Sequence, residues 1–482
     1  MLKNNLLAIC FLLFANSLSA NNIQVTSVST TVVGTERFIN CSLSWDNSWR
    51  TATNSANWDA AWVFVKFRRN TNTAWSHATL NYATTGTATA CGHTEPSGAS
   101  ITTPADGKGV FIYRNADGAG SVSFNNAAIK WNYAADGISA NDPVTVEVYA
   151  VEMVYVPQGS FYLGSGGNNT GEFRDGSTNN PLLVTSEAAI TVGTTAGNLN
   201  YTGSTDVGDA AGPIPAAFPK GFAAFYCMKY EISQGQYADF LNNILSTQTF
   251  NRYNNGTSNY RYTLTGAHPN ILSSVPTRAC NYLSWADGLS YADWSGLRPM
   301  TETEYEKACR GSGNNAVFNE YAWGSTNIYY PTYQTSVSTY FINNNNNNET
   351  GNGGNCIAGM SSSSNHGPSR SGCYANATST RESAGASYYG IMEMSGNLWE
   401  QVVPAGSAAG RSFTGAHGDG ALDVNGAANV GSWSATSSGL RGGSWFFTNV
   451  QELRTSGRTN AINTTVTTRG TTYGFRAVRT AQ

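Results

Sequence analysis

Residues 388–400 (YYGIMEMSGNLWE) place two glutamates, a Gly-Asn pair and a tryptophan inside an otherwise apolar segment. Charged side chains are rarely buried without a partner, so this composition is not typical of an ordinary strand or helix. The pattern instead predicts a buried turn whose carboxylates bind a positively charged group. Any fold of this chain has to supply partners for Glu393 and Glu400.

Two interpretations of this turn follow from the residue types. In the first, a hard cation such as Ca²⁺ takes carboxylate and carbonyl oxygens as ligands, and the glycine lets the backbone curl round the ion. The ligands would be Glu393, Gly396, Leu398 and Glu400. In the second, both glutamates pair with arginines such as Arg381 or Arg441, and the Gly-Asn pair forms a tight turn. The residue types alone favour the second interpretation.

Further motifs occur in order along the chain. They are MVYVPQGSF (153–161), YEISQGQY (230–237), RPMTETEYEKA (298–308), YAWG (321–324), GNLWE (396–400), RGGSW (441–445) and GFR (474–476). Together they resemble the formylglycine-generating enzyme, or sulfatase-modifying factor, family. The resemblance implies a compact fold of little regular secondary structure, akin to C-type lectins. It also implies a structural calcium at Glu393, Gly396, Leu398 and Glu400, so the cation interpretation becomes the preferred one.

The same resemblance bears on catalysis. Family members that oxidise a sulfatase cysteine to formylglycine use two cysteines that follow the Gly-Gly-Ser strand and bind copper. Counted forward without gaps, these positions hold Phe447 and Glu452, and no cysteine follows Cys373. Thiolate is the soft ligand that Cu(I) prefers, and neither a phenyl ring nor a carboxylate replaces it. We therefore predict no catalytic residues and no copper.

Two other residues match positions that line the family's active site. These residues, Trp399 and Ser444, are predicted to be structural here because the thiolates are missing. Ergothioneine-type relatives use an iron held by histidines of an added helical domain. The five histidines of this chain are widely scattered, so that chemistry is not expected either; they are His77, His93, His268, His366 and His417.

The first residues predict export. A lysine precedes an apolar run, and Ser-Leu-Ser-Ala then ends at Ala20, which is typical of a secretory signal peptide over residues 1–20. Cys10 lacks the small residue expected before a lipidated cysteine, so we predict a secreted or cell-surface protein rather than a lipoprotein. No later stretch is apolar enough to span a bilayer.

Composition supports this setting. Charged residues make up 12% of the chain, about half of the roughly 25% usual in soluble domains. Gly, Asn, Ser and Thr take their place, so loops should dominate. A net charge of −3 gives no electrostatic case for binding nucleic acid or an anionic membrane surface.

The cysteines after residue 20 are odd in number. In an oxidising compartment they favour disulfides, yet at least one must be free or paired between chains. Cys41 and Cys91 are candidates for closing a loop, while a small buried hydrophobe is the alternative for each of them.

Residues 21–150 alternate apolar and polar positions in short runs separated by turn clusters. This pattern predicts an antiparallel β-sandwich of about seven strands. Its tryptophans are predicted mainly to pack in the core, with an aromatic platform for sugar as the alternative; they are Trp45, Trp49, Trp58, Trp62, Trp75 and Trp131.

Residues 151–482 form the predicted family domain, so the whole chain belongs to the α+β class. Hydroxyl-to-Glu/Gln capping spacings predict helices over 234–243 and 302–310, and a third helix starts at Ser284. Residues 164–216, the asparagine run 343–348 and residues 405–438 are predicted loops. No linker separates residues 150 and 151, so the two domains should pack against each other.

We therefore predict a secreted, calcium-stabilised, non-catalytic family member that acts as an extracellular binding or structural protein. Its partner would be a glycan, a protein or a second copy of itself. Three alternatives stay open. The first is active formylglycine generation, which copper binding would reveal. The second is a subunit of a surface assembly, which filaments or oligomers would reveal. The third is a diversified receptor, which variation around residues 445–469 between strains would reveal.

Overall fold

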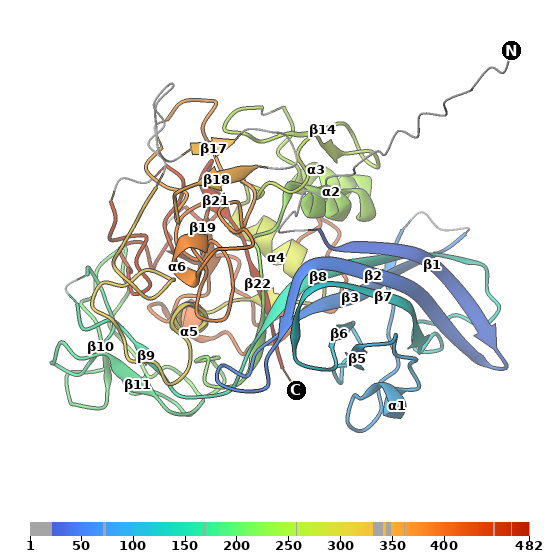
Figure 1. Cartoon of the computed structure of the whole chain (residues 1–482), viewed down its shortest axis with the longest axis horizontal. Coiled ribbons are helices and arrows are strands. Elements are labelled where there is room, and N and C mark those ends of the chain that lie inside the picture. Colours follow the sequence, from blue (N-terminus) through green and yellow to red (C-terminus); the bar gives the residue numbers. More distant parts are fainter. Residues whose placement is uncertain are drawn as a thin grey trace, which may run out of the picture.

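The computed structural model describes residues 22–481 apart from 71–73, 168, 257, 331–340, 344–348, 361, 447–448 and 464. The predicted signal peptide and the position of Phe447 lie outside the described residues. Most of the regular structure is strand, and helices are few and short (Figure 1). The described residues include no helix whose length and hydrophobicity would allow it to cross a membrane.

The N-terminal part is a pair of packed antiparallel sheets, as predicted. Its elements are β1 (Gln24–Val33), β2 (Glu36–Arg50), β3 (Asp59–Arg69), β4 (Ser76–His77), α1 (Ala88–Cys91), β5 (Ala99–Thr102), β6 (Val110–Arg114), β7 (Gly118–Trp131) and β8 (Val144–Val156). One sheet has the order β1-β2-β7, and β3, β5, β6 and β8 belong to the other. The inward side chains of β2 and β7 pack against those of β3 and β6 in one core.

Strand β3 is buried on both faces. Ala61, Val63 and Val65 point into the core between the two sheets. Trp62 and Phe64 point the other way, into a second core built mainly by the rest of the chain. Successive residues of a strand face opposite sides, and a strand covered on both sides has an unbroken apolar sequence. This explains the run Ala-Ala-Trp-Val-Phe-Val in the middle of the strand.

The second part is dominated by loops and has the following elements. The helices are α2 (Gln234–Asn243), α3 (Ser246–Arg252), α4 (Trp285–Trp294), α5 (Glu302–Arg310), α6 (Arg381–Ala384) and α7 (Ala408–Arg411). The strands are β9 (Phe161–Leu163), β10 (Arg174–Asp175), β11 (Leu182–Val184), β12 (Leu199–Asn200), β13 (Phe225–Met228), β14 (Leu264–Thr265), β15 (Leu272–Ser273), β16 (Arg298–Pro299), β17 (Phe341–Asn343), β18 (Thr350–Asn352), β19 (Trp399–Val402), β20 (Gly439–Arg441), β21 (Tyr473–Gly474) and β22 (Ala477–Thr480). The predicted fold class is confirmed.

One sheet joins the two parts. Its strand order is β16-β22-β13-β8-β3-β6-β5, with β4 beside β3. Strand β8 crosses the predicted boundary at residue 150 and pairs with β3 on one side and with β13 on the other. The two parts are therefore joined by backbone hydrogen bonds, which is a closer connection than the packing contact expected from the sequence.

The three helices predicted from capping signals are present as α2, α4 and α5. Ser233, Ser284 and Thr301 each accept a hydrogen bond from the backbone N–H three residues later. Helix α3 was not predicted, because its N-cap is Leu245, which has no hydroxyl to accept such a bond. At this helix only the second half of a capping box is present, in which the Gln248 side chain accepts a hydrogen bond from the Leu245 N–H at 2.9 Å.

The seven cysteines after residue 20 are all buried and none forms a disulfide. The proposed bridge between Cys41 and Cys91 is wrong. Cys41 faces the core between the sheets, whereas the Cys91 sulfur lies 3.3 Å from the backbone nitrogen of Ala83. The small-hydrophobe interpretation holds for all seven. Trp45, Trp62 and Trp131 are likewise fully buried, so these three rings form core rather than a sugar platform.

Candidate functional site

The turn of residues 393–397 is buried and uses backbone conformations that most side chains avoid. Glu393, Gly396 and Asn397 have φ values of +55°, +96° and +61°. A side chain on residue 396 would place its Cβ 2.7 Å from both the Cys356 sulfur and the Ile357 carbonyl oxygen. Glycine is therefore required there by both the dihedral and the space, as expected for a tight turn.

Glu400 follows the turn at the start of β19 and meets an arginine. Its Oε1 lies 2.8 Å from Nε of Arg476, and both side chains are buried. The same guanidinium donates to the carbonyls of Met228 (2.8 Å) and Met392 (2.7 Å). The arginine of the GFR motif thus ties the turn to β13. The partner is Arg476, and not Arg381 or Arg441 as the arginine interpretation supposed.

Glu393 has a different environment. Both of its carboxylate oxygens accept from the backbone N–H of Gly372 at 2.8 Å, and it forms no ion pair in the described part of the chain. Burial raises the pKa of Glu393 to about 7, although the Gly372 hydrogen bond opposes that rise. The structure thus places Glu393 in the turn and Glu400 just after it but gives them separate protein partners.

A third carboxylate, Glu231, belongs to the same site and was not singled out from the sequence. It accepts from the Leu398 N–H (2.9 Å), the Ser371 hydroxyl (2.8 Å) and the Asn397 side-chain amide. Burial and then repulsion from Glu400 raise the pKa of Glu231 well above its ordinary value. The sequence signal that could have identified Glu231 is its carboxylate between the apolar residues Tyr230 and Ile232.

The chemistry of this donor set fits a hard cation. Its carboxylate and carbonyl oxygens are the ligands that Ca²⁺ prefers. Glu400 Oε2 is buried and has no hydrogen-bond partner among the described residues. No group of three or more His, Cys, Asp or Glu side chains in the described ranges is arranged to hold a metal ion. An ion at this turn would therefore depend on the backbone carbonyls of Gly396 and Leu398.

The second site suggested by the resemblance is the family's pair of catalytic positions. Phe447 lies outside the described residues, and Glu452 is 7% exposed. The Glu452 Oε2 and the Ser444 hydroxyl are buried without a hydrogen-bond partner among the described residues. Trp399 is also buried. Burial raises the pKa of Glu452 to about 7, although a hydrogen bond with Asn460 opposes that rise.

Glu452 should make stability depend on pH. The pKa of about 7 in the folded chain exceeds the roughly 4.3 of an unfolded glutamate, so the folded state binds this proton more tightly. The resulting stabilisation is complete below pH ~4.3 and is lost as the pH rises through ~7. Between pH 5 and pH 8, the free energy of unfolding should fall by about 1 kcal/mol more in the wild type than in Glu452→Gln, after allowance for solvent screening. Urea titrations at both pH values measure the free energy of unfolding. An equal change in that free energy between pH 5 and pH 8 for the wild type and for Glu452→Gln would refute the prediction.

Two further family motifs, at 298–308 and 441–445, contribute to a buried ion-pair network. Arg441 of RGGSW lies 3.1 Å from Glu302 and 2.7 Å from Glu306, and all three side chains are fully buried. Arg458 also binds Glu302, at 2.8 Å. Burial raises the pKa of Glu306, but the charges of Arg441 and Arg310 outweigh it, so its pKa is below the ordinary value. These motif residues hold α5 against β20.

Comparisons with known proteins identify the family of the chain. The model of the sulfatase-modifying factor enzyme 1-like domain matches residues 139–481, a range that starts shortly before β8. No curated protein matches the chain. Among solved structures, the chain is similar to the "Major Tropism Determinant U1 Variant" at 14% identity, over 94% of this chain and 83% of that chain, with a TM-score of 0.23. That TM-score is too low to establish a shared fold.

Proposed function

Because the chain belongs to the formylglycine-generating enzyme (sulfatase-modifying factor) family, we propose that it is a secreted or cell-surface member that binds a ligand and does not oxidise cysteine. The observation that carries this proposal is the carboxylate of Glu452 at the second catalytic position. A carboxylate is a hard ligand and does not replace the thiolate that Cu(I) requires. Burial raises the pKa of the Cys309 thiol to about 12 and that of Cys356 further, and no cysteine follows Cys373.

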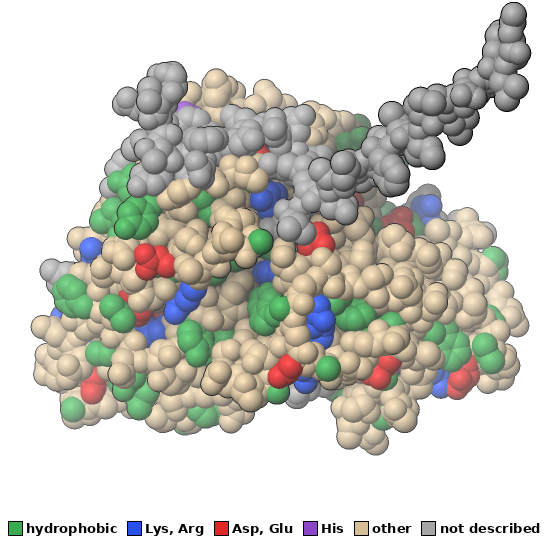
Figure 2. Space-filling view, viewed as in Figure 1, with side chains coloured by type: hydrophobic (Ala, Val, Ile, Leu, Met, Phe, Trp, Pro, Cys, Tyr) green, Lys and Arg blue, Asp and Glu red, His purple; other side chains and the backbone are tan. Residues whose placement is uncertain are grey.

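The surface suits recognition. Figure 2 shows a face on which uncharged polar side chains and backbone predominate over scattered charged and hydrophobic groups. Many of the chain's arginines are buried instead, among them Arg298, Arg370, Arg441, Arg458, Arg476 and Arg479. A loop-rich scaffold with such a surface is commonly used to present binding residues.

Calcium at the 393–400 turn is a further part of the proposal. Glu393 and Glu400 would supply two carboxylates, and Gly396 and Leu398 two carbonyls. The ion would supply positive charge beside Glu393, which forms no ion pair in the described part of the chain, and would bind Glu400 Oε2, which has no hydrogen-bond partner there. Its role would be structural, because an ion bound only by the folded chain raises the stability of that chain.

The enzymatic alternative is tested by incubating the purified chain with Cu(I), oxygen and a peptide containing a sulfatase-type cysteine motif. Mass spectrometry then measures conversion of the cysteine to the aldehyde. We expect no conversion above the level of copper alone, with an active family member as positive control. Aldehyde that forms over repeated turnovers would refute the proposal.

A further inference from the structure

Strand β8 has a free edge. β3 pairs with β8 from Val144 to Val154, whereas β13 pairs with it only from Met153 to Val156. In the described part of the chain, residues 144–151 therefore have no strand partner on the side opposite β3. An unpaired edge presents backbone N–H and C=O groups that another extended chain can use.

Two adjoining cavities run along this edge. Their volumes are about 400 Å³ and about 520 Å³, and both are lined by Val148, Tyr149 and Asp239. Consecutive residues of β8, 148–151 in the first cavity and 146–149 in the second, form the lining. Consecutive residues point to opposite faces of a strand, so it is the backbone edge that borders this groove. Both volumes lie within the usual range for ligand sites.

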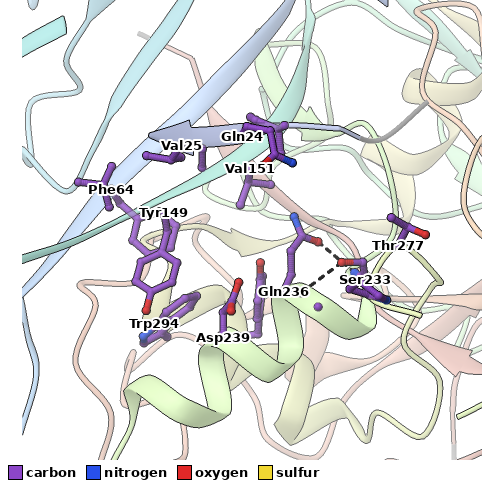
Figure 3. Close-up of a pocket in the computed structure, with 16 residues that line it drawn as sticks. Gln24, Val25, Phe64, Tyr149, Val151, Ser233, Gln236, Asp239, Thr277 and Trp294 are labelled. Carbon is purple, nitrogen blue, oxygen red and sulfur yellow. Dashed lines mark hydrogen bonds between the residues drawn. The ribbon is translucent and has the colours of Figure 1, made fainter. Parts of the chain in front are cut away.

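The other walls come from separate parts of the chain. Figure 3 shows Gln24 and Val25 of β1 on one side and Gln236 and Asp239 of α2 on the other, with the rings of Tyr149 and Trp294 near Asp239. Phe64, Tyr291 and Trp294 also line the first cavity but are at most 3% exposed. These three rings offer no face for sugar to stack on, and the choice of a polypeptide rests on the free backbone edge of β8.

The groove is negatively charged at its centre. Asp239 forms no hydrogen bond or ion pair with any described residue. The charge that acts on it is another carboxylate, Glu147, and Asp239 itself is exposed to solvent. Glu147 itself accepts from the Tyr149 hydroxyl and from Asn243 (3.0 Å), which are both neutral donors. The basic side chain that lines the second cavity, Arg68, stacks on Trp75 at 4.5 Å.

We propose that the groove binds an extended polypeptide segment, which adds to the free edge of β8 and places a lysine or arginine side chain at Asp239 and Glu147. Main-chain hydrogen bonds to the edge would supply affinity, and the basic side chain would supply specificity. Charge-assisted hydrogen bonds to the two carboxylates are stronger than neutral ones. This inference rests on the proposed binding function and names its partner class.

The first test uses capped peptides of about eight residues, a usual strand length, with alternating threonine and valine and one central lysine. Isothermal titration should show binding that weakens about tenfold or more when norleucine replaces the lysine, which corresponds to the loss of one charge-assisted contact. Asp239→Asn should weaken binding of the lysine peptide to a similar extent. Asp117→Asn, an exposed aspartate of the sandwich, is the matched control and should leave binding unchanged.

A second test addresses the strand pairing. Residues of an added strand donate alternately toward and away from the edge of β8. N-methylation of one alternate set of peptide nitrogens should therefore abolish binding, while methylation of the other set is tolerated. Equal effects of the two sets would overturn the pairing.

Three further outcomes would also overturn the proposal. One is the absence of binding by a panel of lysine and arginine peptides, and another is binding that Asp239→Asn leaves unchanged. The third is dimerisation of the chain through this edge that the peptide fails to compete away, which would assign the edge to a second copy. Melting curves confirm that the variants are folded. Failure in any of these ways leaves the non-catalytic proposal standing, since none of these outcomes bears on copper binding or cysteine oxidation.

Discussion

Replacing Arg441 with methionine is expected to lower the free energy of unfolding by about 3–5 kcal/mol, the usual cost of removing one partner from a buried ion pair. The substitution removes the contacts of Arg441 with Glu302 and Glu306 and its 2.8 Å hydrogen bond to the Thr455 carbonyl. Both glutamates would remain buried with less positive charge beside them. Urea unfolding monitored by tryptophan fluorescence measures the loss.

The matched control is an exposed ion pair in the sandwich. Lys130 pairs with Glu36, and both side chains are partly exposed to solvent. Lys130→Met should change stability by less than about 1 kcal/mol, as is usual for surface pairs. A loss below about 1 kcal/mol for Arg441→Met as well would show that the motif arginine does not stabilise the fold through its charge.

Replacing Trp62 with alanine is expected to cost about 3–5 kcal/mol, in the range for large core rings. Trp62 is fully buried where the shared sheet meets the second part of the chain. Its Nε1 donates to the Ser295 carbonyl at 2.8 Å, and Arg479 lies over the ring at 4.4 Å. Because β8 belongs to both parts, the variant should still unfold in one transition at a lower urea concentration.

Trp75→Ala is the control for this prediction. The Trp75 ring is only half-buried and stacks on Arg68, so its loss should cost about 1 kcal/mol. Calorimetry of Trp62→Ala shows whether the two parts of the chain unfold together or independently. Two separated transitions, with the second part melting as in the wild type, would show that the parts fold independently and that the shared sheet contributes little.

Local signals account for the elements that were predicted correctly. Ser233, Ser284 and Thr301 cap their helices through contacts only three residues long, so short patterns were enough to place α2, α4 and α5. Short alternating runs separated by turn clusters indicated the strands of residues 21–150. The pairing of β8 with β13 depends on contacts between distant segments, and no local pattern encodes that register. For this reason the sequence predicted two packed domains rather than one shared sheet.

Only those residues of the candidate site that lie close together in the sequence could be predicted from it. Glu393, Gly396, Leu398 and Glu400 lie within one short motif, and the structure places them in one buried turn and directly after it. Arg476 and Glu231 come from the far end of the chain and from the segment before α2, and only the fold reveals that they face Glu400 and Asn397. Whether the turn holds calcium as well as Arg476 stays a prediction.

The most direct test of the central claim is elemental analysis of the chain purified without chelator, with copper and calcium read per polypeptide. We predict no stoichiometric copper, because Glu452 stands where the family's second thiolate would be, together with roughly one calcium at the oxygen-rich turn. Stoichiometric copper would contradict the account and restore the oxidase alternative. Absence of both metals would leave the non-catalytic claim intact. It would also show that Arg476 alone balances the charge of Glu400.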